Sequence, residues 1–199
     1  GQTLSNFGAR ITKTTTISDQ AAEIINALNT VSNETDCVII TGGLGPTNDD
    51  ITKHTLAAHY GLALKMHQET LEHIEGYFKN RNRPMLESNR LQAMLPDGCT
   101  VLRNKNGTAA GMWINSGKQV VISLPGVPYE MKSIVEDELL PLLTKKYNPS
   151  ALYFKTAHTQ GIGESFLAEK IRDWEKALNA DALQLAYLPS PGFVKLRIN

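Results

Sequence analysis

A glycine-rich segment followed by two adjacent aspartates is the part of this sequence best suited to chemistry. Residues 41–52 read Thr-Gly-Gly-Leu-Gly-Pro-Thr-Asn-Asp-Asp-Ile-Thr. Gly42, Gly43 and Gly45 free the backbone for a tight loop. Bare loop amides favour a bound phosphate, as does the positive end of a helix that follows such a loop.

Two common phosphate-binding motifs are incomplete in this segment. A Walker A loop ends in Gly-Lys-Ser/Thr, but no lysine follows Gly45 until Lys53. A dinucleotide fingerprint needs a third glycine, but Asn48 stands at that place. The segment is therefore compatible with phosphate without being either motif.

Asp49 and Asp50 leave two interpretations open. Carboxylates stabilise a helix N-terminus, and a helix capped by Thr47 would place Asp50 where a capping box has its acidic residue. The same carboxylates would repel a phosphate bound there, unless a divalent cation such as Mg²⁺ lay between them. The spacing alone does not choose between metal binding and plain capping.

Short strands and helices must position this loop. Residues 37–40 are an apolar run bounded by turn residues, which predicts a central strand buried on both faces. Residues 9–17, rich in threonine and isoleucine, predict an earlier strand, and Ser18 or Asp19 would cap the helix between the two. The order strand, helix, strand, helix favours an α/β fold with a parallel sheet, which binds ligands at its carboxyl edge.

A second loop follows a strand predicted over residues 118–124, which would form a hairpin with residues 112–115. Pro128, in this loop, suits the first turn of the next helix. The loop either shares the carboxyl edge of the sheet with the glycine-rich loop or is merely a rigid turn. We predict the shared pocket, with Gly43 and Gly126 facing it from the two loops.

Four polar residues lie close together in a short helical stretch predicted over residues 85–94. They are Glu87, Asn89, Arg90 and Gln92. These side chains could line a pocket. The alternative is a solvated helix face on which Glu87 and Arg90 pair, and the pattern alone favours this alternative.

The composition is that of an ordinary soluble globular protein, with 41% hydrophobic and 20% charged residues. Lys and Arg together number 20, as do Asp and Glu, so the net charge indicates neither nucleic acid nor an anionic membrane as a partner. Cys37 and Cys99 do not have metal-site spacing, which favours a reduced, cytoplasmic protein. No apolar run approaches membrane-spanning length, and the first residue is Gly1, so the chain is expected to be a fragment or a trimmed protein.

Pro149 and Ser150 mark the predicted boundary between two domains, residues 1–147 and 150–199. The second domain is predicted to contain a strand over residues 152–158, a helix to about residue 178 and two final strands. It carries six basic and five acidic residues from position 151 on and lacks a Gly-x-x-Gly clamp. Nucleic-acid binding is therefore not expected.

Several motifs together resemble the competence/damage-inducible protein A (CinA) family. They are residues 41–52, 88–90, 92–93, 104–111, 124–128, 130–131 and 188–192. The resemblance implies a three-layer, mostly parallel molybdopterin-binding-like domain followed by a small KH-type α+β domain. The family's first strand and part of its KH-type domain would be missing from this chain.

The same resemblance implies metal-dependent hydrolysis of the pyrophosphate bond of ADP-ribose, giving AMP and ribose 5-phosphate. The metal would be Mg²⁺ or a transition metal such as cobalt, held by Asp50 with Asp49 as the second candidate. Catalysis would also involve Asn89 and Arg90. The implied substrate-binding residues are Thr41, Gly42, Gly43, Gly45, Thr47, Thr108, Gly126 and Pro128.

A binding module is the alternative to an enzyme, because the same fold binds molybdopterin and could hold a nucleotide without turnover. The family's carboxyl-terminal amidohydrolase domain is not in this sequence, so deamidation is not expected. The resemblance also implies a homodimer. The missing first segment would put the hydrolytic activity of the chain in doubt.

Overall fold

The computed structural model describes residues 2–31, 34–117, 119–148, 155–181 and 183–198. The chain divides into two compact units. The larger is Thr14–Tyr147, and the smaller combines Gly1–Lys13 with Asn148–Asn199. The change of unit after Tyr147 lies next to the boundary predicted at Pro149.

A four-stranded sheet forms the centre of the larger unit. Its order is β1 (Cys37–Thr41), β6 (Gln119–Leu124), β5 (Gly111–Ser116) and β4 (Thr100–Leu102). β1 runs parallel to β6, while β5 is antiparallel to both β6 and β4. The α/β class and the predicted hairpin are confirmed. The described sheet is mixed rather than mostly parallel, because short connections join β4 to β5 and β5 to β6.

β1 lies at the edge of the described sheet and is only half-buried, whereas the sequence predicted a central strand buried on both faces. The strand predicted over residues 9–17 is also wrong: this segment has no regular structure and is mostly exposed. Threonine and isoleucine favour strands only where a neighbouring strand supplies hydrogen bonds and packing.

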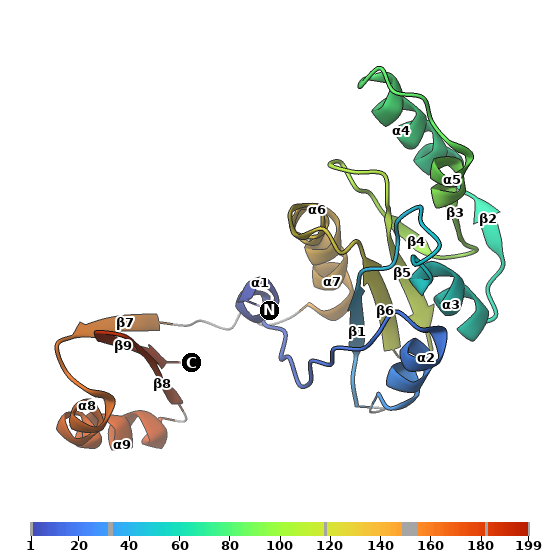
Figure 1. Ribbon diagram of the computed structural model, residues 1–199. Coiled ribbons are helices and arrows are strands. Elements are labelled where there is room, and N and C mark those ends of the chain that lie inside the picture. The colour runs from blue at the N-terminus through green and yellow to red at the C-terminus, as the bar shows by residue number, and fades with distance from the viewer. Residues whose placement is uncertain (1, 32–33, 118, 149–154, 182, 199) are drawn as a thin grey trace. The chain divides into compact units, whose positions relative to one another are not determined.

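Helices cover both faces of the sheet and make three layers (Figure 1). On one side lie α2 (Ala21–Asn29) and α3 (Thr52–His59). On the other side are α6 (Pro128–Ile134) and α7 (Leu140–Tyr147), joined by one wider π turn. Leu56 of α3 packs with Ile114 and Val121 of the sheet, which fixes the start of α3 near the end of β1.

Two predicted helix caps are wrong. Gln20 precedes α2 without a side-chain cap, so neither Ser18 nor Asp19 caps it. α3 begins at Thr52, five residues after Thr47. Residues 47–50 instead form a turn of their own, in which the Asp50 amide donates to the Thr47 carbonyl at 3.0 Å. This turn places Asp50 ahead of the helix rather than in its first turn.

A small lobe interrupts the larger unit between α3 and β4. It contains β2 (Leu64–Met66) paired antiparallel with β3 (Met94–Pro96), and α4 (Gln68–Lys79), α5 (Glu87–Arg90) and the 3-10 turn Leu91–Ala93. The apolar residues Leu71 and Ile74 of α4 pack on Ala93, as the helical spacing of α4 predicts. This packing sets the position of the turn Leu91–Ala93.

The smaller unit has the α+β composition that the sequence predicts. Its described elements are α1 (Gln2–Phe7), β7 (Lys155–Gln160), α8 (Glu164–Lys170), α9 (Arg172–Ala180), β8 (Leu185–Ser190) and β9 (Phe193–Ile198). The strands form an antiparallel sheet in the order β7-β9-β8. The single predicted helix is two helices that meet at Ile171, and residues 152–154 of the predicted strand lie outside the described residues. The KH type of this unit stays a prediction.

Candidate functional site

The glycine-rich loop after β1 and the loop after β6 come together at the carboxyl ends of these two parallel strands. Thr41 lies opposite Leu124 in the register, and the Gly42 amide donates to the Leu124 carbonyl at 2.9 Å. A Cβ atom on Gly126 would lie 3.3 Å from the Gly42 Cα. The loops therefore approach so closely because both carry glycine at this point.

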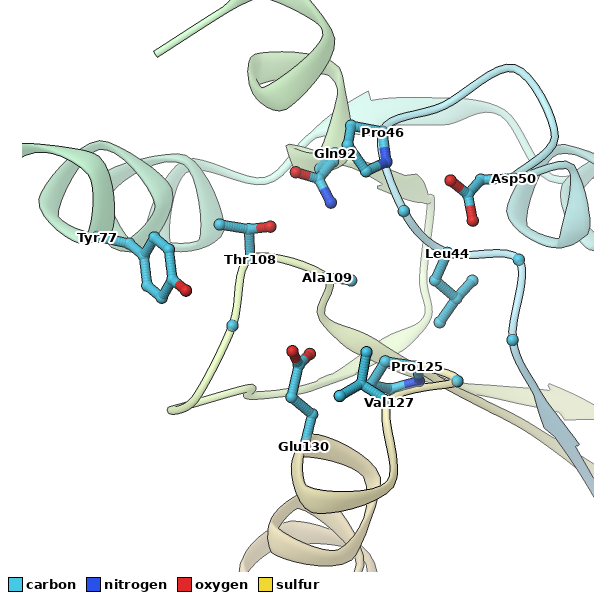
Figure 2. Close-up of a pocket in the computed structure, with 15 residues that line it drawn as sticks. Leu44, Pro46, Asp50, Tyr77, Gln92, Thr108, Ala109, Pro125, Val127 and Glu130 are labelled. Carbon is cyan, nitrogen blue, oxygen red and sulfur yellow. The ribbon is translucent and has the colours of Figure 1, made fainter. Parts of the chain in front are cut away.

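A pocket of about 340 Å³ lies where the loops meet (Figure 2). Its wall consists of residues 42–46 and 50, residues 77 and 92, residues 107–109, and residues 125–127 and 130. Gly43 and Gly126 both line it, so the predicted shared pocket is confirmed. The close approach of the loops allows segments more than 80 residues apart in the sequence (residue 43 and residue 126) to act on one ligand.

The glycine-rich loop is shaped by contacts that only glycine permits. Gly43 has φ +67°, and a Cβ atom there would overlap the Thr52 side chain. A Cβ atom on Gly45 would lie 2.5 Å from Oδ2 of Asp50. The Thr52 amide donates to the Gly43 carbonyl at 3.1 Å, which ties the loop to the start of α3.

The backbone amides of this loop are not all available to a ligand. The Gly42 amide is bonded to Leu124, and the Gly45 amide donates to the Asp50 carboxylate. Among the described residues, the Gly43 amide has no acceptor. A phosphate would thus bind at Gly43 rather than at all three predicted glycines.

Asp50 is a fixed, ionised carboxylate at the edge of the pocket. Its Oδ2 accepts hydrogen bonds from the Thr47 amide at 3.0 Å and from the Thr47 hydroxyl at 2.6 Å. Partial burial acts to raise the pKa of Asp50, but the bonds from Thr47 and the Gly45 amide outweigh it and hold that pKa below its ordinary value. Thr47 therefore orients Asp50 instead of capping a helix.

A second carboxylate, Glu130 of α6, faces the pocket from the opposite wall (Figure 2). Asn104, which is only 1% exposed, donates from Nδ2 to Oε2 of Glu130 at 2.7 Å and to the Ala109 carbonyl at 2.9 Å. A Cβ atom on Gly107 would collide with the Glu130 carboxylate. Asn104 thus holds both Glu130 and the loop over residues 107–109 in place.

Gln92 lies in the wall of the pocket with its side-chain amide unpaired. The residue is 4% exposed, and neither Oε1 nor Nε2 has a hydrogen-bond partner among the residues that the structure describes. Behind it, the ammonium of buried Lys53 donates to the Leu91 carbonyl at 2.9 Å and to the Gln92 carbonyl at 3.5 Å. Burial lowers the pKa of Lys53 to about 8. Lys53, which lies too far from Gly45 to complete a Walker A loop, therefore supports the backbone of the pocket wall at Leu91 and Gln92.

Half of the predicted site residues line this pocket. They are Gly42, Gly43, Gly45, Asp50, Thr108 and Gly126. Three of the others lie beside it: Thr41 ends β1, Thr47 holds Asp50, and Pro128 is the first residue of α6. Asp49, exposed in the turn before α3, does not line the pocket.

Asn89 and Arg90 do not line the pocket either. Asn89 is buried, and its Oδ1 accepts from the Leu86 amide at 3.1 Å, so it caps α5. Arg90 points to α4, where it lies 3.9 Å from Glu75 rather than pairing with Glu87. Arg90 therefore lies on a solvated face of α5. Gln92, in the following 3-10 turn, lines the pocket instead.

Among the polar residues of the pocket, Tyr77 and Glu130 were not predicted from the sequence, and Gln92 was named only as one of four polar residues that could line a pocket. Gln92 and Glu130 stood inside motifs that were singled out, but no spacing rule relates them to the glycine-rich loop. Tyr77 belongs to the helical pattern of α4 and carries no sequence signal for a site. Their common pocket depends on tertiary packing alone.

The described residues contain no group of three or more His, Cys, Asp or Glu that could hold a metal ion. The pocket does offer two carboxylates, Asp50 and Glu130. This set does not suit a structural zinc site, which needs four protein ligands. One of these carboxylates with a substrate phosphate suits Mg²⁺, which keeps several waters and is usually bound by one or two carboxylates together with substrate phosphates.

Comparison with known proteins follows the same division of the chain. Residues 1–145 match the family described as a probable molybdopterin binding domain. The crystal structure of the protein CinA with unknown function from Thermoplasma acidophilum matches with a TM-score of 0.61 and 32% identity, over 73% of this chain and 82% of that one. The chain belongs to the CinA family.

Curated CinA relatives match along the whole chain. A CinA-like protein of Flavobacterium psychrophilum is 46% identical over 202 residues, which cover 100% of this chain and 47% of the relative. A CinA-like protein of Cytophaga hutchinsonii is 44% identical over 98% of this chain and 46% of its own length. A putative competence-damage inducible protein of Caldicellulosiruptor bescii is 38% identical. The chain thus spans about half the length of these relatives.

Proposed function

We propose that the pocket binds a nucleoside diphosphate compound of the ADP-ribose type and hydrolyses its pyrophosphate bond with a divalent metal ion, to give AMP and ribose 5-phosphate. The observation that carries the proposal is the pairing of a phosphate-compatible glycine loop with an ionised carboxylate, Asp50, in one pocket. Glu130 on the opposite wall adds the second carboxylate. Membership of the CinA family supports a site at this place but does not define the substrate.

Each residue has a definite part in this proposal. The Gly43 amide would donate to a phosphate oxygen, because it has no acceptor among the described residues. Asp50, fixed by Thr47, would hold the metal ion together with substrate phosphate, while Glu130, fixed by Asn104, would face the ligand from the opposite wall. A bound divalent ion would neutralise phosphate charge and lower the pKa of a water molecule that attacks phosphorus.

A nucleotide- or molybdopterin-binding module without turnover is the second candidate. It is favoured by the family match over residues 1–145, whose description names molybdopterin binding. Both candidates use the same pocket, so they differ only in whether the bound ligand is cleaved.

The two candidates are separated by incubating the chain with ADP-ribose and, in parallel, Mg²⁺, Mn²⁺, Co²⁺, Zn²⁺ or no metal. Metal-dependent release of AMP and ribose 5-phosphate, separated by ion-exchange chromatography, is the expected result. Tight pterin binding without release of AMP would contradict hydrolysis and support the binding module. The longer relative from Flavobacterium psychrophilum, assayed alongside, shows whether elements outside this chain are needed.

A further inference from the structure

We propose that Gln92 determines the specificity of the pocket by pairing with a ligand group that presents a hydrogen-bond donor next to an acceptor. This inference rests on the proposed function and adds the part of the substrate that is recognised. The group is the edge of an adenine base or the paired hydroxyls of a ribose, which share this donor and acceptor chemistry.

The state of the Gln92 side chain is the first argument. It is 4% exposed, and in the described part of the chain both its amide oxygen and its amide nitrogen lack a hydrogen-bond partner. Buried polar side chains in native proteins are almost always hydrogen-bonded, so each exception needs an explanation. Since Gln92 lines the pocket, a ligand is the partner that satisfies both atoms.

The direction of the side chain is the second argument. In Figure 2 the Gln92 amide extends into the pocket beside Thr108, while Asp50 lies on the glycine-rich loop and Glu130 on the opposite wall. The pocket therefore has a charged part, suited to phosphate and metal, and a neutral polar part around Gln92. A nucleoside diphosphate has the same division into charged and neutral parts.

The rigidity of the Gln92 backbone is the third argument. The Lys53 ammonium, 7% exposed, donates to the carbonyls of Leu91 and Gln92 at 2.9 and 3.5 Å. On the other side, Ala93 packs against Leu71 and Ile74 of α4. A side chain on so fixed a turn can select a ligand, because little freedom is lost when the ligand binds.

The chemistry of the carboxamide selects the ligand group. A glutamine carboxamide donates through nitrogen and accepts through oxygen in one plane. The adenine edge, with its 6-amino donor beside a ring-nitrogen acceptor, takes a glutamine side chain in a bidentate pair. Tyr77, which also lines the pocket, adds an aromatic ring with Arg81 3.5 Å from its centroid, and bases stack on rings of this type.

The test is calorimetric titration of Gln92→Met and Gln92→Glu with ADP-ribose in the absence of metal. Gln92→Met conserves the length of the side chain, removes both polar atoms and is expected to weaken binding by about 10-fold to 100-fold, as for the loss of one bidentate pair. Gln92→Glu keeps acceptors but loses the donor and is expected to weaken binding as well. The matched control is Gln68→Met at the exposed start of α4, where Gln68 donates to Glu72 at 3.0 Å.

Two ligand analogues identify the recognised group. If Gln92 reads the base, ADP-ribose with a purine that lacks the 6-amino group binds weakly to the parent chain, and Gln92→Met causes no further loss. If Gln92 reads a ribose, the 2′-deoxy analogue shows this coupling instead. Either pattern supports the inference and identifies the ligand group, base or ribose, that pairs with Gln92.

The outcomes separate this inference from the proposed function. Unchanged binding of all three ligands by Gln92→Met, in a chain that hydrolyses ADP-ribose, would overturn the role of Gln92 alone. Tight ADP-ribose binding that depends on Gln92, without hydrolysis under any metal, would overturn the hydrolysis alone. Failure of the unsubstituted chain to bind or cleave ADP-ribose, both without metal and with each divalent metal, would overturn both. Circular dichroism melting curves verify that each variant is folded.

Discussion

Asp50 is the residue whose change separates a metal ligand from a purely structural carboxylate. In Asp50→Asn the side chain keeps an acceptor for the Thr47 amide and hydroxyl. The free energy of unfolding should therefore fall by no more than about 1 kcal/mol. Metal-dependent turnover of ADP-ribose should fall far more, because the negative charge facing the pocket is lost. Urea unfolding and an AMP-release assay measure the two effects.

Asp49→Asn is the matched comparison, since Asp49 precedes Asp50 but is exposed and does not line the pocket. It should reduce turnover less than Asp50→Asn does. Equal losses from both substitutions would mean that the two carboxylates share the ion. Normal turnover by Asp50→Asn, at a temperature where the variant is folded, would leave Asp50 with a structural role only.

Lys53 gives the free energy of unfolding a distinctive pH dependence. Its pKa is lowered by burial from 10.5 to about 8, so between these values the unfolded chain binds the proton that the folded chain has released. The unfavourable contribution of the buried charge is fully present below pH 8 and disappears as the pH rises to 10.5. Stability relative to Lys53→Met should therefore increase with pH across this window.

Urea unfolding of the parent and of Lys53→Met, at pH values from about 7 to 11, measures the difference directly. Effects of other titrating groups cancel in this comparison. A difference that stays constant over the whole range would show that burial does not shift the proton affinity of Lys53. Lys53→Met also leaves the carbonyls of Leu91 and Gln92 without their donor, so weaker ADP-ribose binding is expected at all pH values.

The junction between the glycine-rich loop and α3 depends on the absence of a side chain at Gly43. In Gly43→Ala the new Cβ atom would overlap Thr52 in a backbone conformation with φ +67°. We expect a loss of about 1–3 kcal/mol in the free energy of unfolding, the usual cost of such strain. Turnover should fall as well, because the loop would move away from the start of α3.

Gly76→Ala in α4 is a control with the opposite expected sign. A Cβ atom on Gly76 would meet no other atom within 4 Å, and the residue lies inside a helix. Alanine is favoured over glycine there by about 0.5–1 kcal/mol. If Gly43→Ala and Gly76→Ala changed stability alike, the shape of the loop would not depend on glycine.

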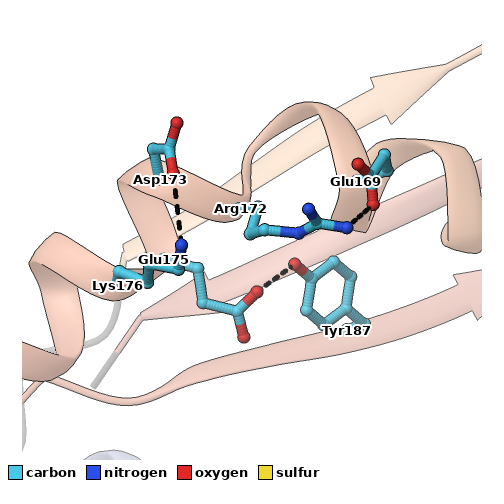
Figure 3. A network of polar contacts seen from close by, with 6 residues as sticks. All are labelled: Glu169, Arg172, Asp173, Glu175, Lys176 and Tyr187. Atoms are coloured by element: carbon cyan, nitrogen blue, oxygen red, sulfur yellow. Dashed lines mark hydrogen bonds and ion pairs between the residues drawn. The ribbon is translucent and has the colours of Figure 1, made fainter.

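The smaller unit is predicted not to bind nucleic acid. Its helices pair basic with acidic side chains, Arg172 with Glu169 and Lys176 with Asp173, and the Tyr187 hydroxyl donates to Glu175 at 2.8 Å (Figure 3). Such pairing leaves no basic stripe on these helices to follow a phosphate backbone. Fluorescence anisotropy with labelled RNA and single-stranded DNA should show no salt-dependent binding. Salt-sensitive binding that is lost on replacing Lys195 and Arg197 would contradict this.

The described part of the chain has no helix long and apolar enough to cross a membrane. The cytoplasmic location and the homodimer stay predictions. Sedimentation velocity over a range of protein concentrations would test the dimer, whose dissociation on dilution follows mass action.

Elements with a local cause could be predicted from the sequence alone. The apolar run over residues 37–40 specified β1, helical spacing specified α4, and Pro128 opened α6. The meeting of the two loops in one pocket was also predictable, because both follow parallel strands whose carboxyl ends lie at the same edge of the sheet. The order of the predicted strands and helices favoured the α/β class, and the family motifs agreed with it. In each case a few neighbouring residues carry the whole signal.

Which side chains share the pocket depends on packing between distant segments and could not be predicted. Lys53 contacts Leu91, and Asn104 contacts Glu130, across long separations in the sequence. Helical spacing could not tell that α5 turns Arg90 to solvent while the next turn carries Gln92 inward. Residues 9–17 have high β propensity but form no strand, because a strand also requires a neighbouring strand to pair with. Local propensity acts over a few residues, whereas a pocket is made by packing between segments that are distant in the chain.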